Sequence, residues 1–217
     1  MIDSQYSGQI LLDNLIHQWR FATPSEQIKV EQTLWQHFGQ TKAVLILDMC
    51  GFSKTTSRQG IIAALAKIQQ MNAIVQPTLQ AYQGTIIKSE ADNIFAIFDH
   101  PLQAIAASHA TYQAVQTEGL SVAIGIGYGS ILLIPGAALH EDWMYEDFFG
   151  DEVNLASKLG EDTATGGELW LTAAAYQAIH SHLAQQNERL NDCYDDRWEE
   201  NHLAISGIEM TAYRTIL

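Results

Sequence analysis

An apolar run closed by a single carboxylate is the feature that most constrains this chain. The segment "VLILDMCGFSKTT" begins at Val44, and its residues Leu45–Leu47 predict a buried strand that Asp48 closes. A Gly, a Phe and several hydroxyl residues follow before a helical pattern starts. Because an isolated buried charge costs several kcal/mol unless it is paired or bound to metal, something must neutralise Asp48.

The patterns around this strand predict an α+β fold. Periodicity and turn residues give, in order, a strand at 43–48, a helix at 55–82, strands at 85–89 and 93–98, a helix at 101–117, two strands within "SVAIGIGYGSILLI", a helix at 150–159, a strand at 168–172 and a short helix to 180. Pro77 predicts a kink or break in the first helix. The order β-α-β-β-α-β indicates a ferredoxin-like sheet with helices on one face. After an acidic loop at 186–201, a C-terminal β-hairpin turns near Gly207.

Residues 1–40 predict an N-terminal helical extension, and residues 41–217 the main domain. At Thr23–Glu26, "TPSE" supplies a capping residue, a Pro and a Glu in the order of a helix start. Gly39 ends that helix. We expect the extension to pack on the main domain, and the alternative is a regulatory arm.

The composition limits the functions open to this domain. Eleven basic residues face 25 acidic ones, for a net charge of −14, so we expect neither a nucleic-acid partner nor an anionic membrane. A nucleotide remains compatible, because a divalent metal can bridge acidic groups and phosphates. Cys50 and Cys193 show no CxxC spacing, and no apolar run is long enough to span a membrane. We therefore expect a cytoplasmic protein.

A second acid supplies a reason for the first. Asp92 lies in the turn between the strands at 85–89 and 93–98, and in the predicted sheet this hairpin neighbours the strand that Asp48 closes. Two converging carboxylates repel each other, and hard oxygen ligands suit Mg²⁺ or Mn²⁺. In "CGFSKTT", backbone N–H groups at a helix start form a potential phosphate site, with Gly51 allowing close approach. The alternative is that either acid only caps a helix.

At this point the sequence resembles the catalytic domain of the class III nucleotidyl cyclases, the adenylyl and guanylyl cyclases. The blocks that carry the resemblance are "LDMCGFS", "YQGTIIKSEADNIFAIF", "GIGYG", "DFFGDEVNLASKLGEDTATGGELWLT" and "AISGIEMTAYRTI". They fall in the family's order at compatible spacings and cover roughly residues 41–217.

The resemblance implies a metal and phosphate site. Asp48 and Asp92 would bind two divalent metal ions, Mg²⁺ or Mn²⁺, with the backbone carbonyl of Met49 as a further ligand. One ion would activate the ribose 3′-hydroxyl, and the other would hold the triphosphate. The backbone of residues 50–53 would cradle the phosphates, in particular Gly51, Phe52 and Ser53.

The resemblance also implies the residues that read the nucleotide. Lys88 and Asp147 occupy the base-reading positions, where this pairing selects adenine, although an alignment shifted by one residue would substitute Glu146. A snorkelling surface lysine is the alternative for Lys88. Asn154 matches the asparagine that orients the ribose. Lys158 falls where the family usually has an Arg that contacts the attacked phosphate.

Three departures from the family pattern bear on efficiency. Lys158 keeps the charge of the usual Arg but not its planar fork. Ala91 replaces a Gly in the turn before Asp92, and "SGI" at 206–208 lacks a lysine that the family often has there.

The predicted activity is metal-dependent conversion of ATP to 3′,5′-cyclic AMP and pyrophosphate. The family's head-to-tail arrangement implies a homodimer whose sites take Asp48 and Asp92 from one subunit and the other side chains from its partner. One alternative is a weak or inactive cyclase-like module that acts as a nucleotide-binding or regulatory subunit. Another is a cyclase that prefers GTP or a pyrimidine nucleotide.

Overall fold

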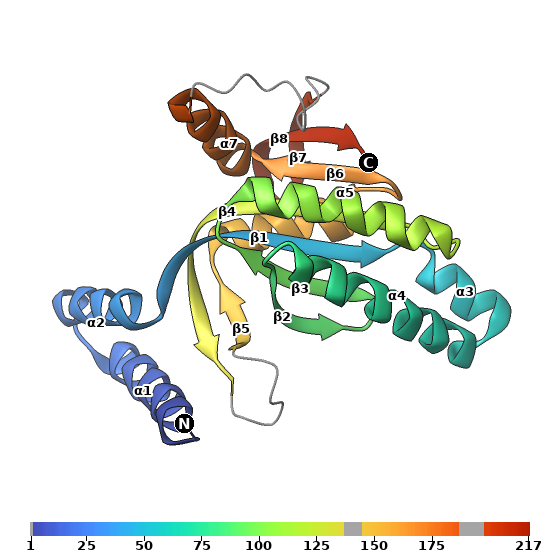
Figure 1. Cartoon of the computed structure of the whole chain (residues 1–217). Helices are drawn as coiled ribbons and strands as arrows, with labels where there is room; N and C mark the ends of the chain where they lie inside the picture. The colour runs from blue at the N-terminus through green and yellow to red at the C-terminus, as the bar shows by residue number, and fades with distance from the viewer. Residues whose placement is uncertain (1, 137–144, 187–197) are drawn as a thin grey trace.

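The computed structural model describes residues 2–136, 145–186 and 198–217 (Figure 1). The helices are α1 (Ile2–Phe21), α2 (Pro24–Phe38), α3 (Phe52–Gln59), α4 (Ile61–Ala81), α5 (Pro101–Thr117), α6 (Asp151–Ser157), the π-helical η1 (Lys158–Thr163) and α7 (Ala173–Gln186). The strands are β1 (Gly39–Met49), β2 (Thr85–Glu90), β3 (Asn93–Phe98), β4 (Val122–Pro135), β5 (Tyr145–Phe149), β6 (Glu168–Thr172), β7 (Glu199–Ile205) and β8 (Ile208–Ile216).

One eight-stranded sheet organises the chain. Its order is β2-β3-β1-β4-β6-β8-β7, with β5 paired to β4 beyond this path. The apolar strand β1 lies between β3 and β4 and is antiparallel to both. The sequence β1, α4, β2, β3, α5, β4 gives the predicted β-α-β-β-α-β core, which confirms the α+β fold class.

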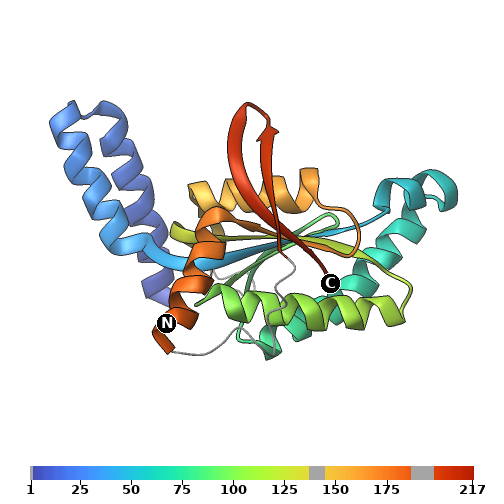
Figure 2. The same ribbon diagram turned by 90° about the horizontal axis from the view of Figure 1, so that it is seen from above.

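The two faces of the sheet carry different layers. Leu45 and Leu47 of β1 pack into a core that α4, α5 and α7 cover. Val44 and Ile46 point to the other face, where α6 packs. Figure 2 shows α6 and η1 on the opposite side of the sheet from α5. The two helices of the predicted β-α-β-β-α-β core, α4 and α5, therefore lie on one face as expected, and α6, which follows this core, covers part of the second face.

Two predicted elements have different boundaries in the structure. The single helix expected at 55–82 is two helices, α3 and α4, separated at Gly60, whose φ of +88° strongly favours glycine. The helix α4 continues through Pro77 without a break. The two strands expected in "SVAIGIGYGSILLI" are one strand, β4.

Glycines on β4 leave room for a close approach of α6 and η1. A Cβ at Gly125 would lie 2.2 Å from the carbonyl oxygen of Ala156 and 2.6 Å from the nitrogen of Gly160. A Cβ at Gly127 would lie 2.5 Å from the carbonyl oxygen of Glu152. These helix residues are spaced four apart and so share one face. The "GIGYG" stretch of β4 therefore lacks the Cβ atoms that would prevent a helix backbone from packing closely against the strand.

The N-terminal helices α1 and α2 form a pair beside the start of β1 (Figure 1). Leu15, Leu34 and Phe38 form their small core, against which Leu132 of β4 packs. The predicted start of α2 is confirmed by the capping box between Thr23 and Glu26. At the other end of the chain, Ser206 and Gly207 both have positive φ, as in the two-residue turns that close hairpins.

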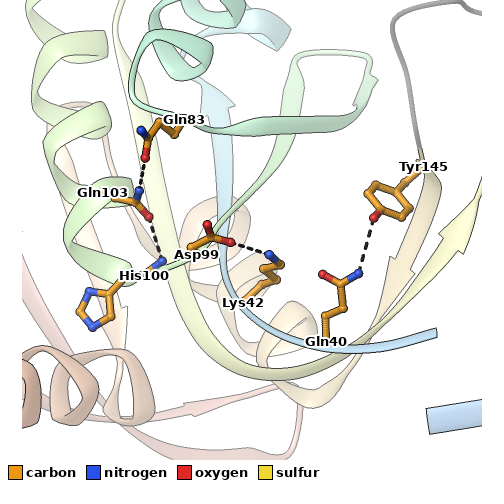
Figure 3. A network of polar contacts seen from close by, with 7 residues as sticks. All are labelled: Gln40, Lys42, Gln83, Asp99, His100, Gln103 and Tyr145. Atoms are coloured by element: carbon orange, nitrogen blue, oxygen red, sulfur yellow. Dashed lines mark hydrogen bonds and ion pairs between the residues drawn. The ribbon is translucent and has the colours of Figure 1, made fainter. Parts of the chain in front are cut away.

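A polar network holds the sheet end at which β1 begins (Figure 3). Lys42 contacts Asp99 at 2.5 Å, and the backbone N–H of His100 donates to Gln103 Oε1 at 3.0 Å to cap α5. Asp48 follows Lys42 by six residue steps along the extended strand β1, a distance of about 20 Å. This network therefore stabilises the fold at a distance from the acids. Among the described residues, no helix is long and apolar enough to cross a membrane.

We predict that Gly125→Ala lowers the free energy of unfolding by about 2–3 kcal/mol, because backbone atoms of α6 and η1 occupy the space of the new methyl group. Urea unfolding measures the loss. Gly119→Ala is the control, since Gly119 has φ +69° but no atom within 4 Å of a Cβ, so it reports backbone strain of about 1 kcal/mol. Equal losses in both variants would contradict the packing argument.

Candidate active site

Asp48 and Asp92 lie at the same end of the sheet. Asp48 pairs in register with Asn93, and the backbone N–H of Met49 donates to the carbonyl oxygen of Asp92 at 3.1 Å. Burial raises the pKa of Asp48 to about 7, and repulsion from Asp92 and Glu161 adds to the shift. None of the described basic side chains forms an ion pair with Asp48. Its negative charge is therefore uncompensated within the described chain.

This donor set fits a divalent metal ion that shares its ligands with a substrate. Mg²⁺ is commonly bound by one or two carboxylates together with substrate phosphates. The described residues contain no group of three or more His, Cys, Asp or Glu side chains placed to hold a metal alone. Asp48, Asp92 and the carbonyl of Met49 are thus suited to such a shared site and would leave coordination positions for phosphate oxygens.

The turn after β1 places a helix start beside these acids. Gly51 precedes α3 with φ +89°, and Phe52 packs against the helix-covered core. Ser53 is exposed. The backbone N–H of Cys50 donates to the carbonyl oxygen of Ser121 at 2.9 Å, which leaves Gly51–Ser53 as the part of the turn open to an anion. Burial, with repulsion from the neighbouring acids, raises the pKa of the Cys50 thiol to about 11.

Lys88 and Asp147 come together from different strands. The Lys88 Nζ lies 3.1 Å from Asp147 Oδ1 and 3.2 Å from Glu90 Oε1. It also lies 5.0 Å from the centroid of the Phe95 ring, a cation–π contact. Burial lowers the pKa of Lys88, but the hydrogen bonds that it donates to Asp147 and Glu90 outweigh this effect, and the pKa is raised. The ammonium group is thus held charged and fixed.

A β-bulge decides which face Lys88 occupies. Ile86 pairs with Ala96, but Lys88 pairs with Phe95, so Ile87 is an extra residue in β2. Ile86 therefore packs in the helix-covered core, whereas Ile87 and Phe95 pack in the core of the other face. Regular alternation would have kept Lys88 on the same face as Ile86. The bulge turns Lys88 toward Asp147.

Asn154 and Lys158 lie one turn apart along α6 and η1. Asn154 is exposed, and Lys158 is half-buried at the start of η1. The carbonyl of Lys158 accepts a hydrogen bond from the Thr163 hydroxyl at 2.9 Å. No described residue forms an ion pair with Lys158. Its ammonium group therefore has no ionic partner within the described chain.

The sequence analysis missed three carboxylates near these residues. Glu161 is close enough to raise the pKa of Asp48. Glu90 is the second partner of Lys88. It lies two residues after Lys88 in the same strand, and residues with this spacing share a face, so the sequence could have indicated the contact. Glu152 of α6 binds β4 and β6. Its partners are 24 and 20 residues away in the sequence, so no local sequence pattern predicts this role of Glu152.

The alanine in the turn between β2 and β3 is strained. Ala91 has φ +50°, a left-handed conformation that costs an L-residue about 1–2 kcal/mol. The turn thus keeps a glycine-like shape despite the methyl group, and Asp92 still follows it next to Asp48.

Comparisons with known proteins give the class. The sequence pattern of the adenylate and guanylate cyclase catalytic domain matches residues 39–194, and the chain belongs to this family. It is therefore a class III nucleotidyl cyclase catalytic domain, as the resemblance predicted. No curated protein sequence matches the chain.

Solved structures similar in fold include cyclases of both purine types. The adenylyl cyclase CyaB from P. aeruginosa has a TM-score of 0.60 at 20% identity, covering 81% of this chain and 94% of its own. An adenylate/guanylate cyclase/hydrolase from Silicibacter pomeroyi gives 0.63 at 19%, covering 82% and 98%. The guanylate cyclase domain of RhGC from Catenaria anguillulae, solved with GTP, gives 0.62 at 16%, covering 82% and 97%.

We predict that Asp48→Asn stabilises the metal-free protein at about pH 8, because the variant removes a charge that burial disfavours. The folded-state pKa lies above the ordinary 3.8, at about 7. The stability that protonated Asp48 contributes is therefore complete below pH 3.8 and lost as the pH rises to about 7. The melting temperature in EDTA should thus exceed that of wild type at about pH 8 and match it near pH 4. The exposed Asp151→Asn is the control, and a pH-independent difference would contradict the prediction.

Proposed function

We propose that this chain is a metal-dependent adenylyl cyclase that converts ATP to 3′,5′-cyclic AMP and pyrophosphate. The observation that carries the proposal is the ion pair between Lys88 and Asp147, 3.1 Å apart. The pair lies on the sheet face that also carries α6. A lysine that donates to N1 and a carboxylate that accepts from the exocyclic amine complement adenine, whereas guanine presents a donor at N1 and a carbonyl at C6.

The side chains would divide the work between binding and charge. Lys88 and Asp147 orient the base. Asn154 orients the ribose, and Lys158 approaches the attacked α-phosphate, where its charge offsets negative charge that develops in the transition state. Asp48 and Asp92 would hold Mg²⁺ or Mn²⁺, which lowers the pKa of the 3′-hydroxyl and neutralises phosphate charge when bound.

The proposed site is shared across a homodimer. Asp48 and Asp92 of one subunit would face Asn154 and Lys158 of the other, on the sheet face that α6 covers only in part. The exposure of Asn154 and the lack of an ionic partner for Lys158 within the described chain support this arrangement. The guanylyl cyclase domain of the fungus Blastocladiella emersonii, at 15% identity and a TM-score of 0.63, is described as a non-canonical dimer, so it supports association of this fold but not this particular arrangement.

The test is turnover of ATP, GTP, CTP and UTP with Mn²⁺, with the products separated by chromatography. We expect cyclic AMP from wild type and a loss of at least about 100-fold in Asp48→Ala, which removes a metal ligand. Circular dichroism controls for folding. Cyclic GMP as the main product would overturn the adenine assignment. If a folded dimer gave no cyclic product from any nucleotide, the proposal that the chain is an active enzyme would be overturned.

A regulatory nucleotide-binding module is the second candidate. The strained turn at Ala91 and the lysine at position 158 favour it, since each departs from the family pattern at a position with a proposed role in the active site. Such a module would bind ATP with Mn²⁺, by calorimetry, without producing cyclic nucleotide.

We predict that Lys158→Arg raises kcat for ATP about tenfold, because a guanidinium can hold two phosphate oxygens at once where an ammonium acts as a point charge. KM should change little, since the gain is made in the transition state. Lys29→Arg in the remote helix α2 is the matched control. An unchanged kcat in Lys158→Arg would show that the lack of a planar guanidinium at this position does not limit the turnover rate.

A further inference from the structure

The carboxylate of Glu152 joins three elements around the helix that carries Asn154. One oxygen, Oε2, accepts the backbone N–H of Tyr128 in β4 at 3.0 Å and the hydroxyl of Thr172 in β6 at 2.5 Å. The Thr172 hydroxyl oxygen in turn accepts the N–H of Ala175 at 3.2 Å, at the start of α7. A single side chain of α6 is thereby tied to two strands and, through Thr172, to α7.

The described part of the sheet provides no acceptor for the backbone N–H of Tyr128, and Glu152 supplies one. The strand β6 pairs with β4 only at residues 124–126, so the N–H of Tyr128 extends past the end of that pairing. Thr172 is almost fully buried, at 1% exposure. A buried donor without a partner costs as much as a lost hydrogen bond. Without Glu152, the N–H of Tyr128 and the hydroxyl of Thr172 would both lose their acceptor.

Space for this side chain is built into β4. A Cβ at Gly127 would lie 2.9 Å from Glu152 Oε2, and a Cβ at Gly129 would lie 2.8 Å from Glu152 Cγ. The glycine-lined face that admits α6 offers few side chains to stop the helix from sliding or turning. Val153 and Ala156 supply its buried apolar contacts, and these are not directional. The Glu152 hydrogen bonds are directional and define one register.

We propose that Glu152 is a positioning residue that sets the register of α6 on β4 and thereby places Asn154 and Lys158 for catalysis. The inference rests on the proposed cyclase function for its kinetic consequence and on the geometry for its structural one. Asn154 follows two residues later, and Lys158 about one turn after that, so a small rotation of α6 moves both. Misplacement of catalytic groups by about 1 Å can cost about 100-fold in rate.

The experiment compares Glu152→Ala and Glu152→Gln with wild type. The amide oxygen of Gln can still accept both hydrogen bonds, whereas Ala can accept neither. Asp151→Ala is the matched control, because it removes an exposed carboxylate one residue away. The readouts are kcat and KM for ATP with Mn²⁺, and hydrogen exchange of the α6 amides, both measured below the melting temperature of every variant.

We expect Glu152→Ala to lower kcat at least about tenfold with KM within about twofold, because the interactions it displaces act in the transition state. The α6 amides should exchange at least about tenfold faster, since the helix is less anchored. Glu152→Gln should retain kcat within about threefold, and Asp151→Ala should match wild type. An unchanged kcat in Glu152→Ala, or a Gln variant as impaired as Ala, would overturn the inference.

The exchange measurement separates the two hypotheses. If wild type turns over no nucleotide, the cyclase proposal fails, but faster α6 exchange in Glu152→Ala still supports the anchoring role. If exchange in α6 is unchanged in that variant, the positioning inference fails whatever the turnover.

Discussion

The close approach of α6 and η1 to β4 determines how the second face of the sheet is built. A helix backbone can lie this near a strand only where the strand has no Cβ atoms in the way, and Gly125, Gly127 and Gly129 supply that gap. Because the helix packs so close to the strand, the carboxylate of its second residue, Glu152, reaches the backbone of β4, while Asn154 stays exposed and Lys158 half-buried. The positions of Asn154 and Lys158 follow from this contact.

Electrostatics sets the other condition on the site. Asp92 and Glu161 both repel the carboxylate of Asp48, and Lys88 lies between Asp147 and Glu90. With a net charge of −14, the chain has little positive charge to offer a triphosphate. A divalent cation would relieve the repulsion between the acids and supply the charge that the phosphates need. The same acids that destabilise the metal-free fold thus suit the proposed reaction.

Much of the fold and of the candidate site could be predicted from local patterns. The apolar run before Asp48 identified the central strand, and the short spacing between the strands of β2 and β3 placed Asp92 in their turn. The helix break at Gly60 could not be predicted from periodicity, because residues 53–59 have no apolar side chains whose spacing would mark α3 as a separate helix. The single strand β4 was taken for two, since its glycines resemble turn residues until the helix that covers them is known.

The sequence by itself determined the order of the β-α-β-β-α-β core, the pair of acids at one sheet end and membership of the cyclase family, because these depend on residue types at short spacings. Only the tertiary structure decided which face Lys88 occupies and what Glu152 does. A one-residue bulge in β2 reverses the face of every side chain after it, and its presence depends on pairing with β3. The two partners of Glu152 are brought to it by the folding of β4 and β6, over separations that no sequence pattern records.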